Sequence, residues 1–318
     1  MSHNPDLIPI LQHAIQTSPK GRITFAEFMD LVLYHPQVGY YTAQGSALGP
    51  QGDFVTSAHM GHDFGELLAI QLADMWRRLE QPHPFCLVEM GAGQGLVAAD
   101  VLAYLENHDP ECFQALDYRI VEKSAALRQV QQQRLSPWKG RVQWTTLDDI
   151  ADDSVTGCFL SNELVDALPV HLVEQTDDGL QEVYVAAAEP PAASSDILLQ
   201  EMLGPLSTPL VGEYFSLVGI DVSSPQYRPG YRTEAHLAAL TWMQTVAAKL
   251  RRGYVVTIDY GYPADRYYNR TRAKGTLQCY YQHAHHNNPY QHLGRQDITA
   301  HVNFSALERQ GEQSGLNT

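Results

Sequence analysis

The most informative segment of this sequence is Val88-Glu89-Met90-Gly91-Ala92-Gly93-Gln94-Gly95-Leu96, in which an apolar run leads through three alternating glycines into a helical pattern. Glycine at positions 91, 93 and 95 lets the backbone turn tightly and approach a ligand without a Cβ in the way. The dinucleotide-binding fingerprint would need glycine where Leu96 stands, and a phosphate-binding loop would need Gly-Lys followed by Ser or Thr. The segment therefore predicts a first strand-to-helix turn that either holds some other ligand or is only a tight turn.

Short apolar runs alternate with helical patterns from Phe85 onward, which is typical of βαβ units around a parallel sheet. Strands are predicted at 85–90, 118–122, 141–144, 157–161 and 254–259. Helices are predicted at about 96–106, at 124–135 and, before the last strand, at 233–252. We therefore predict an α/β fold with a Rossmann-like, doubly wound sheet over residues 81–318.

About 60 residues separate the fourth predicted strand from the long helix, too many for a loop in a compact unit. They begin as a hairpin, with strands at 171–174 and 182–185 around Asp178-Gly179, and continue through a Pro, Ala and Ser segment at 189–195. We expect an insertion at about 171–230 that shapes a substrate site.

The first 80 residues are predicted to be an N-terminal helical extension. Thr24 and Glu27 form a capping box that opens a helix at 25–34. A loop rich in Gly and aromatic residues follows and contains Asp53 and Phe54; it is too long for an ordinary connector. A further helix is predicted from about 62 to 80. We expect the loop to close over a bound ligand as a lid, the alternative being a plain connection between helices.

The charge balance limits the classes of partner. Among 318 residues, 21 Lys and Arg stand against 36 Asp and Glu, so the formal net charge is −15 and the pI is about 5.3. Clustered Lys and Arg carry most of the affinity for nucleic acids, so this composition argues against a nucleic-acid binder and favours cationic partners.

Cysteine usage and hydropathy indicate where the protein works. The four cysteines are scattered with no Cys-x-x-Cys pair, so neither a disulfide framework nor a zinc motif is predicted. No run of 18 apolar residues is present, and the first 20 residues contain no Arg, which argues against a membrane span and a mitochondrial transit peptide. We expect a bacterial, cytoplasmic protein.

Two acidic residues stand close to the glycine turn in the predicted fold. Glu122 ends the second strand, where a carboxylate in a Rossmann-like sheet can accept hydrogen bonds from both hydroxyls of a ribose. Glu89 lies two residues before the first glycine, near the edge of the sheet where such folds bind ligands. Each acid alone is more often a solvated charge, but together they favour a ligand that carries a positive charge and no pyrophosphate.

The segment from Glu89 to Gly95, followed by Glu122, resembles the class I S-adenosylmethionine-dependent methyltransferases. Five further segments together resemble the MidA family, in the same order between about residues 20 and 307: Gly39-Tyr40-Tyr41, Gly52-Asp53-Phe54-Val55-Thr56, Phe64-Gly65-Glu66-Leu67-Leu68, Ser161-Asn162-Glu163-Leu164-Val165-Asp166-Ala167-Leu168-Pro169 and Asp297-Ile298-Thr299-Ala300-His301-Val302. The family's mitochondrial members are complex I assembly methyltransferases that modify an arginine of a complex I subunit. Its members normally continue past residue 318, so the resemblance implies that the C-terminal part is missing here.

The resemblance assigns roles to individual residues. It implies S-adenosyl-L-methionine as the cofactor, with its methionine part cradled by Gly91, Gly93 and Gly95 and its ribose held by Glu122. Asn162 and Glu163 would line the cofactor and substrate side of the fourth strand. We expect rings of the lid loop to stack on adenine, and Asp53 to meet a cation.

Glu163 and Asp166 are candidate catalytic residues, together with Asn162. If their segment is helical, the two carboxylates lie on one side of a turn and grip a guanidinium by paired hydrogen bonds. The alternative is that Asp166 only caps the start of a helix.

The sequence therefore predicts transfer of a methyl group to a protein side chain, with arginine favoured and a respiratory complex subunit as a possible partner. Three alternatives stay open: a small-molecule methyltransferase, a non-catalytic assembly factor that keeps the cofactor fold, and, far behind, an oxidoreductase. Five histidines between His283 and His301 invite a metal site, but their spacings do not match zinc patterns, so no metal is predicted.

Overall fold

The computed structural model describes residues 3–43, 61–188 and 199–318. Two predictions fall outside these residues: the part of the proposed lid that contains Asp53 and Phe54, and the Pro, Ala and Ser segment at 189–195. Within the described part no helix is both long enough and apolar enough to cross a membrane.

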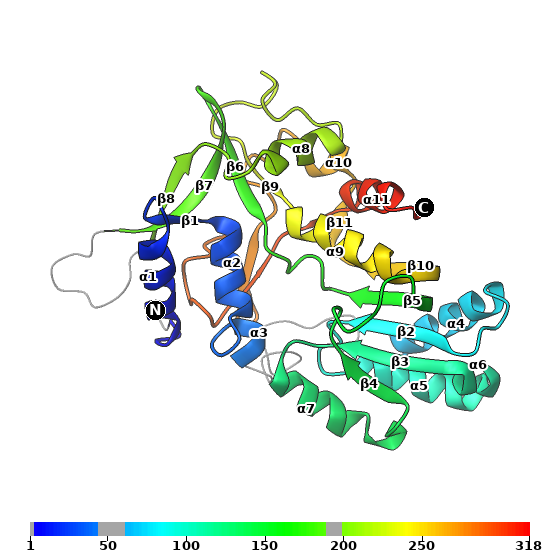
Figure 1. Cartoon of the computed structure of the whole chain (residues 1–318). Helices are drawn as coiled ribbons and strands as arrows, with labels where there is room; N and C mark the ends of the chain where they lie inside the picture. The colour runs from blue at the N-terminus through cyan, green and yellow to red at the C-terminus, as the bar shows by residue number, and fades with distance from the viewer. Residues whose placement is uncertain (1–2, 44–60, 189–198) are drawn as a thin grey trace.

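A five-stranded parallel sheet forms the centre of one half of the molecule (Figure 1). Its strand order is β10-β5-β2-β3-β4, so the chain moves outward from β2 in one direction and then returns to the other side of β2. Each predicted strand is confirmed, with ends that differ by up to four residues. The strands are β2 (Phe85–Met90), β3 (Leu116–Val121), β4 (Val142–Thr145), β5 (Val155–Asn162) and β10 (Leu250–Ile258).

Helices cover both faces of this sheet, as a doubly wound fold requires. Residues of β2 alternate between two cores: Phe85 and Leu87 pack with the helix pair α4 and α5, whereas Cys86 and Val88 pack with α9 and α11. All six residues of β2 are buried. The helices on this half are α4 (Asp63–Arg78), α5 (Leu96–His108), α6 (Pro110–Ala115), α7 (Ala125–Arg134), the short 3₁₀ helix η2 (Ser136–Trp138), α9 (Leu237–Lys249) and α11 (Phe304–Gln313).

The long helix predicted at 233–252 is wrong at both ends. Its first residues belong to strand β9 (Arg232–Ala235), and its last residues already belong to β10. The helix itself, α9, begins at Leu237 and ends at Lys249. Pairing with distant strands decides these ends, because Glu234 pairs with Leu172, and the apolar periodicity of the segment does not reveal such long-range partners.

The predicted hairpin is confirmed and belongs to a second, antiparallel sheet. Its strands are β6 (His171–Thr176) and β7 (Gly179–Ala187), and β9 pairs with β6. β1 (Arg22–Thr24) and β8 (Leu199–Gly204) pair with β7. Because β1 comes from the N-terminal extension, that extension is not purely helical, and it shares a sheet with the insertion.

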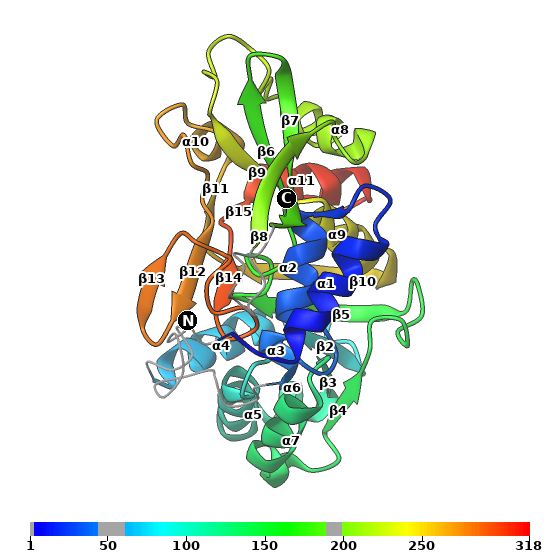
Figure 2. The ribbon, with the colours of Figure 1, turned by 90° about the vertical axis from the view of Figure 1, so that its left-hand side faces the viewer.

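The N-terminal helices pack on this second sheet (Figures 1 and 2). They are α1 (Leu7–Thr17), α2 (Phe25–Tyr34) and the single turn α3 (Tyr40–Ala43). The predicted capping box of α2 is present: Thr24 Oγ1 accepts from the Glu27 amide, and the Glu27 carboxylate accepts from the Thr24 amide. One apolar cluster joins Phe28 of α2 with Val183 of β7 and Ile298 of β14. The extension is thus packed against both the insertion and the C-terminal part of the chain.

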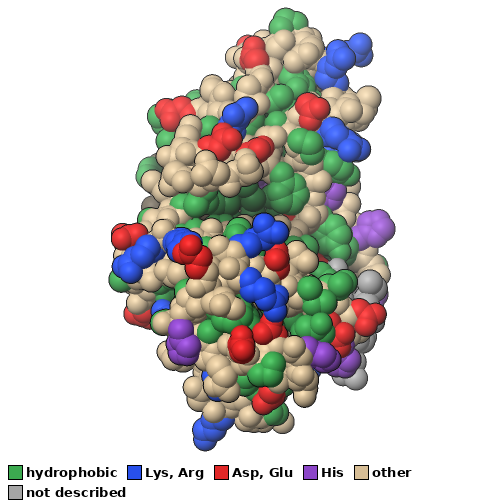
Figure 3. Space-filling view, turned by 90° about the vertical axis from the view of Figure 1, so that its right-hand side faces the viewer, with side chains coloured by type: hydrophobic (Ala, Val, Ile, Leu, Met, Phe, Trp, Pro, Cys, Tyr) green, Lys and Arg blue, Asp and Glu red, His purple; other side chains and the backbone are tan. Residues whose placement is uncertain are grey.

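The remaining elements include two short helices and two small sheets. A three-stranded antiparallel sheet has the order β13-β12-β14, and β11 pairs in parallel with β15. On the face shown in Figure 3, the described Lys and Arg side chains are interspersed with Asp and Glu. The elements are α8 (Pro209–Leu217), β11 (Gly261–Tyr262), α10 (Ala264–Tyr267), β12 (Gln278–Tyr281), β13 (Ala284–His286), β14 (Asp297–Thr299) and β15 (Val302–Asn303).

Candidate functional site

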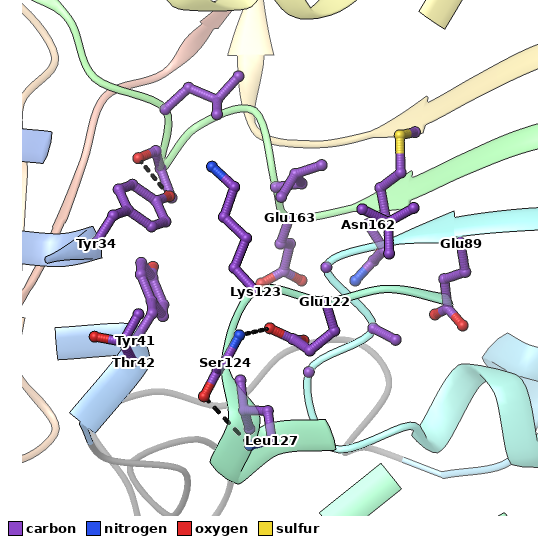
Figure 4. A pocket seen from close by; sticks show the side chains of 18 of the residues that line it. Tyr34, Tyr41, Thr42, Glu89, Glu122, Lys123, Ser124, Leu127, Asn162 and Glu163 are labelled. Atoms are coloured by element: carbon purple, nitrogen blue, oxygen red, sulfur yellow. Dashed lines mark hydrogen bonds between the residues drawn. The ribbon is translucent and has the colours of Figure 1, made fainter. Parts of the chain in front are cut away.

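A cavity of about 270 Å³ lies at the carboxyl ends of β2, β3 and β5 (Figure 4). The strand order reverses between the neighbouring strands β2 and β5, and open α/β sheets bind ligands at such switch points. The predicted site residues that line the cavity are Glu89, Gly91, Gly93, Glu122, Asn162 and Glu163. Gly95 and Asp166 are not part of its wall, and Asp53 and Phe54 lie outside the described residues.

The glycine turn has the backbone conformation that the sequence suggested. Gly91 has a φ of +69°, and a Cβ placed there would lie 2.8 Å from Cδ1 of Leu164, which also lines the cavity. The Gly91 amide donates to the Val121 carbonyl over 3.1 Å, which ties the turn to the end of β3. The left-handed backbone favours glycine at position 91, and any larger residue would also have to displace the Leu164 side chain.

The Glu122 carboxylate is held in place by two donors. Oε1 accepts from the Ser124 amide at 2.8 Å, and Oε2 accepts from Nε2 of Gln131 at 2.9 Å (Figure 4 shows the first of these). Burial raises the pKa of Glu122, while these hydrogen bonds oppose that rise. A carboxylate has about four acceptor sites, so the group can accept further hydrogen bonds from a ligand hydroxyl.

Glu89 is only 3% exposed, and its Oε2 accepts a 2.7 Å hydrogen bond from the Tyr118 hydroxyl. The pKa of Glu89 is raised to about 7. Burial is the main cause, the Tyr118 hydrogen bond opposes the rise, and the charge of Glu122 adds to it. A cation in the cavity would favour the ionised form of this carboxyl.

Asn162 ends β5 and carries an unused acceptor. Its Oδ1 is buried and has no hydrogen-bond partner among the residues that the structure describes. A buried amide oxygen without a donor is costly, so a ligand N–H or O–H in the cavity would stabilise it. The cavity therefore offers an acceptor for a diol at Glu122, an acceptor without a donor at Asn162 and a turn of glycines. This combination fits a nucleoside with an amino-acid tail.

Residues 163–168 form a turn, so both helix-based expectations for this segment are wrong. Asp166 caps no helix, and the segment lacks the helical turn that would align Glu163 with it. The backbone instead wraps around Asp259, whose Oδ2 accepts from the amides of Val165 at 2.9 Å and Asp166 at 3.2 Å. Glu163 has a φ of +50° at the start of this turn. An acceptor from a different strand thus determines the conformation of this segment.

Asp166 lies behind the cavity wall among other carboxylates. Burial raises the pKa of Asp166 well above its ordinary value, and the charges of Asp259, Asp297 and Glu163 raise it further. The Asp297 carboxylate in turn accepts a 2.6 Å hydrogen bond from the Tyr41 hydroxyl. These four acidic side chains come from three separate parts of the chain and lie close enough to raise the pKa of Asp166, so a cation beside them would favour their ionised forms.

The N-terminal extension covers the cavity. Asp30, Tyr34, Tyr41 and Thr42 of α2 and α3 line it. The Tyr34 hydroxyl donates to the Ala167 carbonyl over 2.9 Å, and the rings of Tyr34 and Tyr41 stack with their centroids 5.4 Å apart. Sequence reasoning identified Tyr41 but missed Tyr34, which looked like the last residue of an amphipathic helix.

Lys123 and Gln131 are two further site residues that the sequence did not reveal. Lys123 lines the cavity, and its ammonium group lies 5.7 Å from the centroid of the Tyr34 ring. Gln131 lies on α7 and contacts the glycine turn as well as Glu122. No spacing rule distinguishes either residue from its neighbours, and Gln131 stands in a run of three glutamines.

The histidine-rich region lies away from this cavity. His285 and His286 belong to β13, and none of the histidines between 283 and 301 lines the cavity. Within residues 3–43, 61–188 and 199–318, no three His, Cys, Asp or Glu side chains are grouped so that they could hold a metal ion.

Comparison with known proteins identifies the family of this chain. Residues 67–318 match a family model described as "Putative S-adenosyl-L-methionine-dependent methyltransferase". The chain is 30% identical to the mitochondrial protein arginine methyltransferase NDUFAF7 homolog of Drosophila melanogaster, over 93% of this chain and 68% of that protein. It is 28% identical to human protein arginine methyltransferase NDUFAF7, over 99% of this chain and 72% of that protein.

A solved structure is similar across nearly the whole chain. It is a COG1565 superfamily member from Burkholderia thailandensis bound to S-adenosyl-homocysteine, with a TM-score of 0.83 and 33% sequence identity. The match covers 99% of this chain and 79% of that one.

Proposed function

This chain belongs to the family of S-adenosyl-L-methionine-dependent methyltransferases, and from that premise we propose that it methylates an arginine side chain of a protein. Two observations support the choice of arginine. The relatives that match nearly the whole chain are named protein arginine methyltransferases. The observation that carries the proposal is the group of acidic side chains beside the cavity, Glu163, Asp166, Asp259 and Asp297, because a guanidinium is attracted to such a region.

The residues of the cavity fit the cofactor of this family. We propose that the glycine turn holds its methionine part, that Glu122 accepts from both ribose hydroxyls, and that the Asn162 oxygen accepts from its ammonium group. The negative charge of Glu89 in the same wall favours a cationic ligand. When bound, the cofactor supplies an electrophilic methyl group on a sulfonium, so the protein has to provide mainly position and charge.

Glu163 has the position needed to contact the acceptor, because it lines the cavity at the end of β5. In the proposed reaction a guanidinium nitrogen forms the new bond to the methyl carbon, and the bond from that carbon to sulfur breaks with its electron pair left on sulfur. The nitrogen then loses a proton, which the Glu163 carboxylate accepts. Asp166 acts from behind the wall: its charge stabilises the bound guanidinium, whose arrival lowers the pKa of the Asp166 carboxyl.

Methyl transfer from radiolabelled S-adenosyl-L-methionine tests this proposal. Purified chain is incubated with respiratory complex I, the acceptor suggested by the resemblance, and in parallel with an unrelated arginine-rich protein. Acid hydrolysis and amino-acid analysis then locate the label. We expect methylarginine with the wild-type protein, a strong loss of label with Glu163→Gln and a smaller loss with Asp166→Asn. The exposed control Glu213→Gln should transfer as much label as the wild type.

Three results would contradict the proposal. Label on lysine or on small molecules would place the chain in another acceptor class. Binding of S-adenosylhomocysteine without label in either protein would rule out arginine transfer to these acceptors. Full activity of both Glu163→Gln and Asp166→Asn would eliminate the proposed roles of the two acids.

A further inference from the structure

Gln131 is a fully buried residue of α7 whose side-chain amide makes three hydrogen bonds. Its Nε2 donates to the Gly93 carbonyl at 2.8 Å and to Oε2 of Glu122 at 2.9 Å. Its Oε1 accepts from Nε1 of Trp144 at 2.8 Å. One amide therefore connects the glycine turn after β2, the carboxylate after β3 and an indole on β4.

The donors and acceptors around this amide allow only one orientation. Both neighbours of Nε2 are acceptors, and the neighbour of Oε1 is an obligatory donor. A flipped amide would place its oxygen against the two acceptors and its NH₂ group against the indole N–H. Glutamate at position 131 would place a negative charge beside Glu122, and leucine would remove all three hydrogen bonds of the amide. The side chain therefore has a single arrangement, and it holds its partners at defined positions.

A second hydrogen bond joins α7 to the glycine turn. Nε of Arg134, one helical turn after Gln131, donates to the Gln94 carbonyl at 2.9 Å. Two successive carbonyls of the glycine turn thus accept from the same face of α7. Gly95 also packs against Gln131, since a Cβ at position 95 would lie 3.4 Å from Cγ of Gln131.

We propose that Gln131 is a positioning residue for the cofactor, which sets the distance and angle between the glycine turn and the Glu122 carboxylate. The glycine turn and Glu122 come from separate segments of the chain, and Gln131 donates a hydrogen bond to each of them. It does not itself line the cavity, so it acts through Gly93 and Glu122. This inference depends on the cofactor of the family and is independent of the acceptor.

Calorimetric titration with S-adenosylhomocysteine tests the proposal without requiring methyl transfer. We expect Gln131→Leu to weaken binding about 10- to 100-fold, because it removes one hydrogen bond to a charged group and one to the turn. In the transfer assay, KM for S-adenosyl-L-methionine should rise by a similar factor, while kcat and KM for the acceptor change less than about threefold. The matched control is Gln132→Leu, an exposed residue on the same helix, which should bind like the wild type.

A double-mutant cycle separates positioning from general destabilisation. If Gln131 acts through Glu122, Gln131→Leu added to Glu122→Gln should cost far less affinity than it does alone. Trp144→Phe, which removes the indole donor together with part of the ring, provides a milder variant if Gln131→Leu fails to fold; we expect a threefold to tenfold loss of affinity. The proposal is overturned if folded Gln131→Leu, or Trp144→Phe in its place, binds S-adenosylhomocysteine within twofold of the wild type, or if the two losses in the cycle are additive.

Discussion

Replacing Glu89 by Gln should stabilise the cofactor-free protein, and the gain should grow as the pH rises from acidic to alkaline values. Glu89 is a buried carboxyl in the central strand, and its described neighbours are the Tyr118 hydroxyl and, in the same wall, the Glu122 carboxylate. Among the described residues no Lys or Arg is paired with it. Glutamine has nearly the same shape, and its amide oxygen can still accept from Tyr118.

The expected gain in the free energy of unfolding follows from the pKa of Glu89. Burial raises this pKa to about 7 from an ordinary value of 4.5, so the folded state keeps the proton to higher pH than the unfolded state does. Below about pH 4.5 the carboxyl is protonated in both states and costs nothing. Between pH 4.5 and 7 the cost of ionising it in the folded state grows, and above pH 7 it reaches about 3 kcal/mol. Glu89→Gln removes this cost but weakens the Tyr118 hydrogen bond, so we expect a gain of about 1 to 3 kcal/mol at pH 8.

Urea denaturation at pH 5, 6, 7 and 8, without cofactor, measures this gain. The free energy of unfolding of Glu89→Gln relative to the wild type should be smallest at pH 5 and should rise to its full value by pH 8. Glu213→Gln, which changes an exposed glutamate on α8, should show no such rise. If the stability gain is absent at pH 8, or is the same at all four pH values, the ionisation of Glu89 does not limit stability. The same variant should bind S-adenosyl-L-methionine more weakly, because it lacks the negative charge.

Three further substitutions test local features. Gly91→Ala should weaken binding of S-adenosylhomocysteine at least tenfold in calorimetry, because its φ of +69° is strained for alanine and the new Cβ lies 2.8 Å from Leu164. Tyr34→Phe should lower the free energy of unfolding in urea by about 1 kcal/mol, since it removes the hydrogen bond that joins α2 to the Ala167 carbonyl. Thr24→Ala should cost about 1 kcal/mol in the same assay by removing the cap of α2.

Gly140→Ala is the matched control for the glycine turn. Gly140 has a φ of +90°, but no described atom lies within 4 Å of where its Cβ would be. It should therefore lose stability and keep its affinity for S-adenosylhomocysteine. An equal loss of affinity in both alanine variants would mean that general destabilisation, rather than a change in the glycine turn, explains the effect at position 91.

Patterns that depend on neighbouring residues were predicted well. The strand, glycine turn and helix from 85 to 106, the capping box before α2 and the hairpin around Asp178-Gly179 are all present. Each of these depends on contacts or dihedral angles within a few residues. The same patterns failed where a distant partner decides the conformation, as at β9, which pairs with β6, and at 163–168, which wraps around Asp259.

The sequence alone determined the edge of the sheet at which the site lies. The carboxyl ends of parallel strands meet on one side, so Glu89, Glu122 and Asn162 had to come together once the strands were recognised. Only the tertiary structure decided what surrounds them: the cover formed by Tyr34 and Tyr41, the acidic group around Asp166, and the amide of Gln131. Strand direction is encoded locally, whereas contacts such as Gln131 with Gly93, Tyr34 with Ala167 and Tyr41 with Asp297 join residues 38, 133 and 256 positions apart. Their partners are chosen by the packing of whole elements against one another.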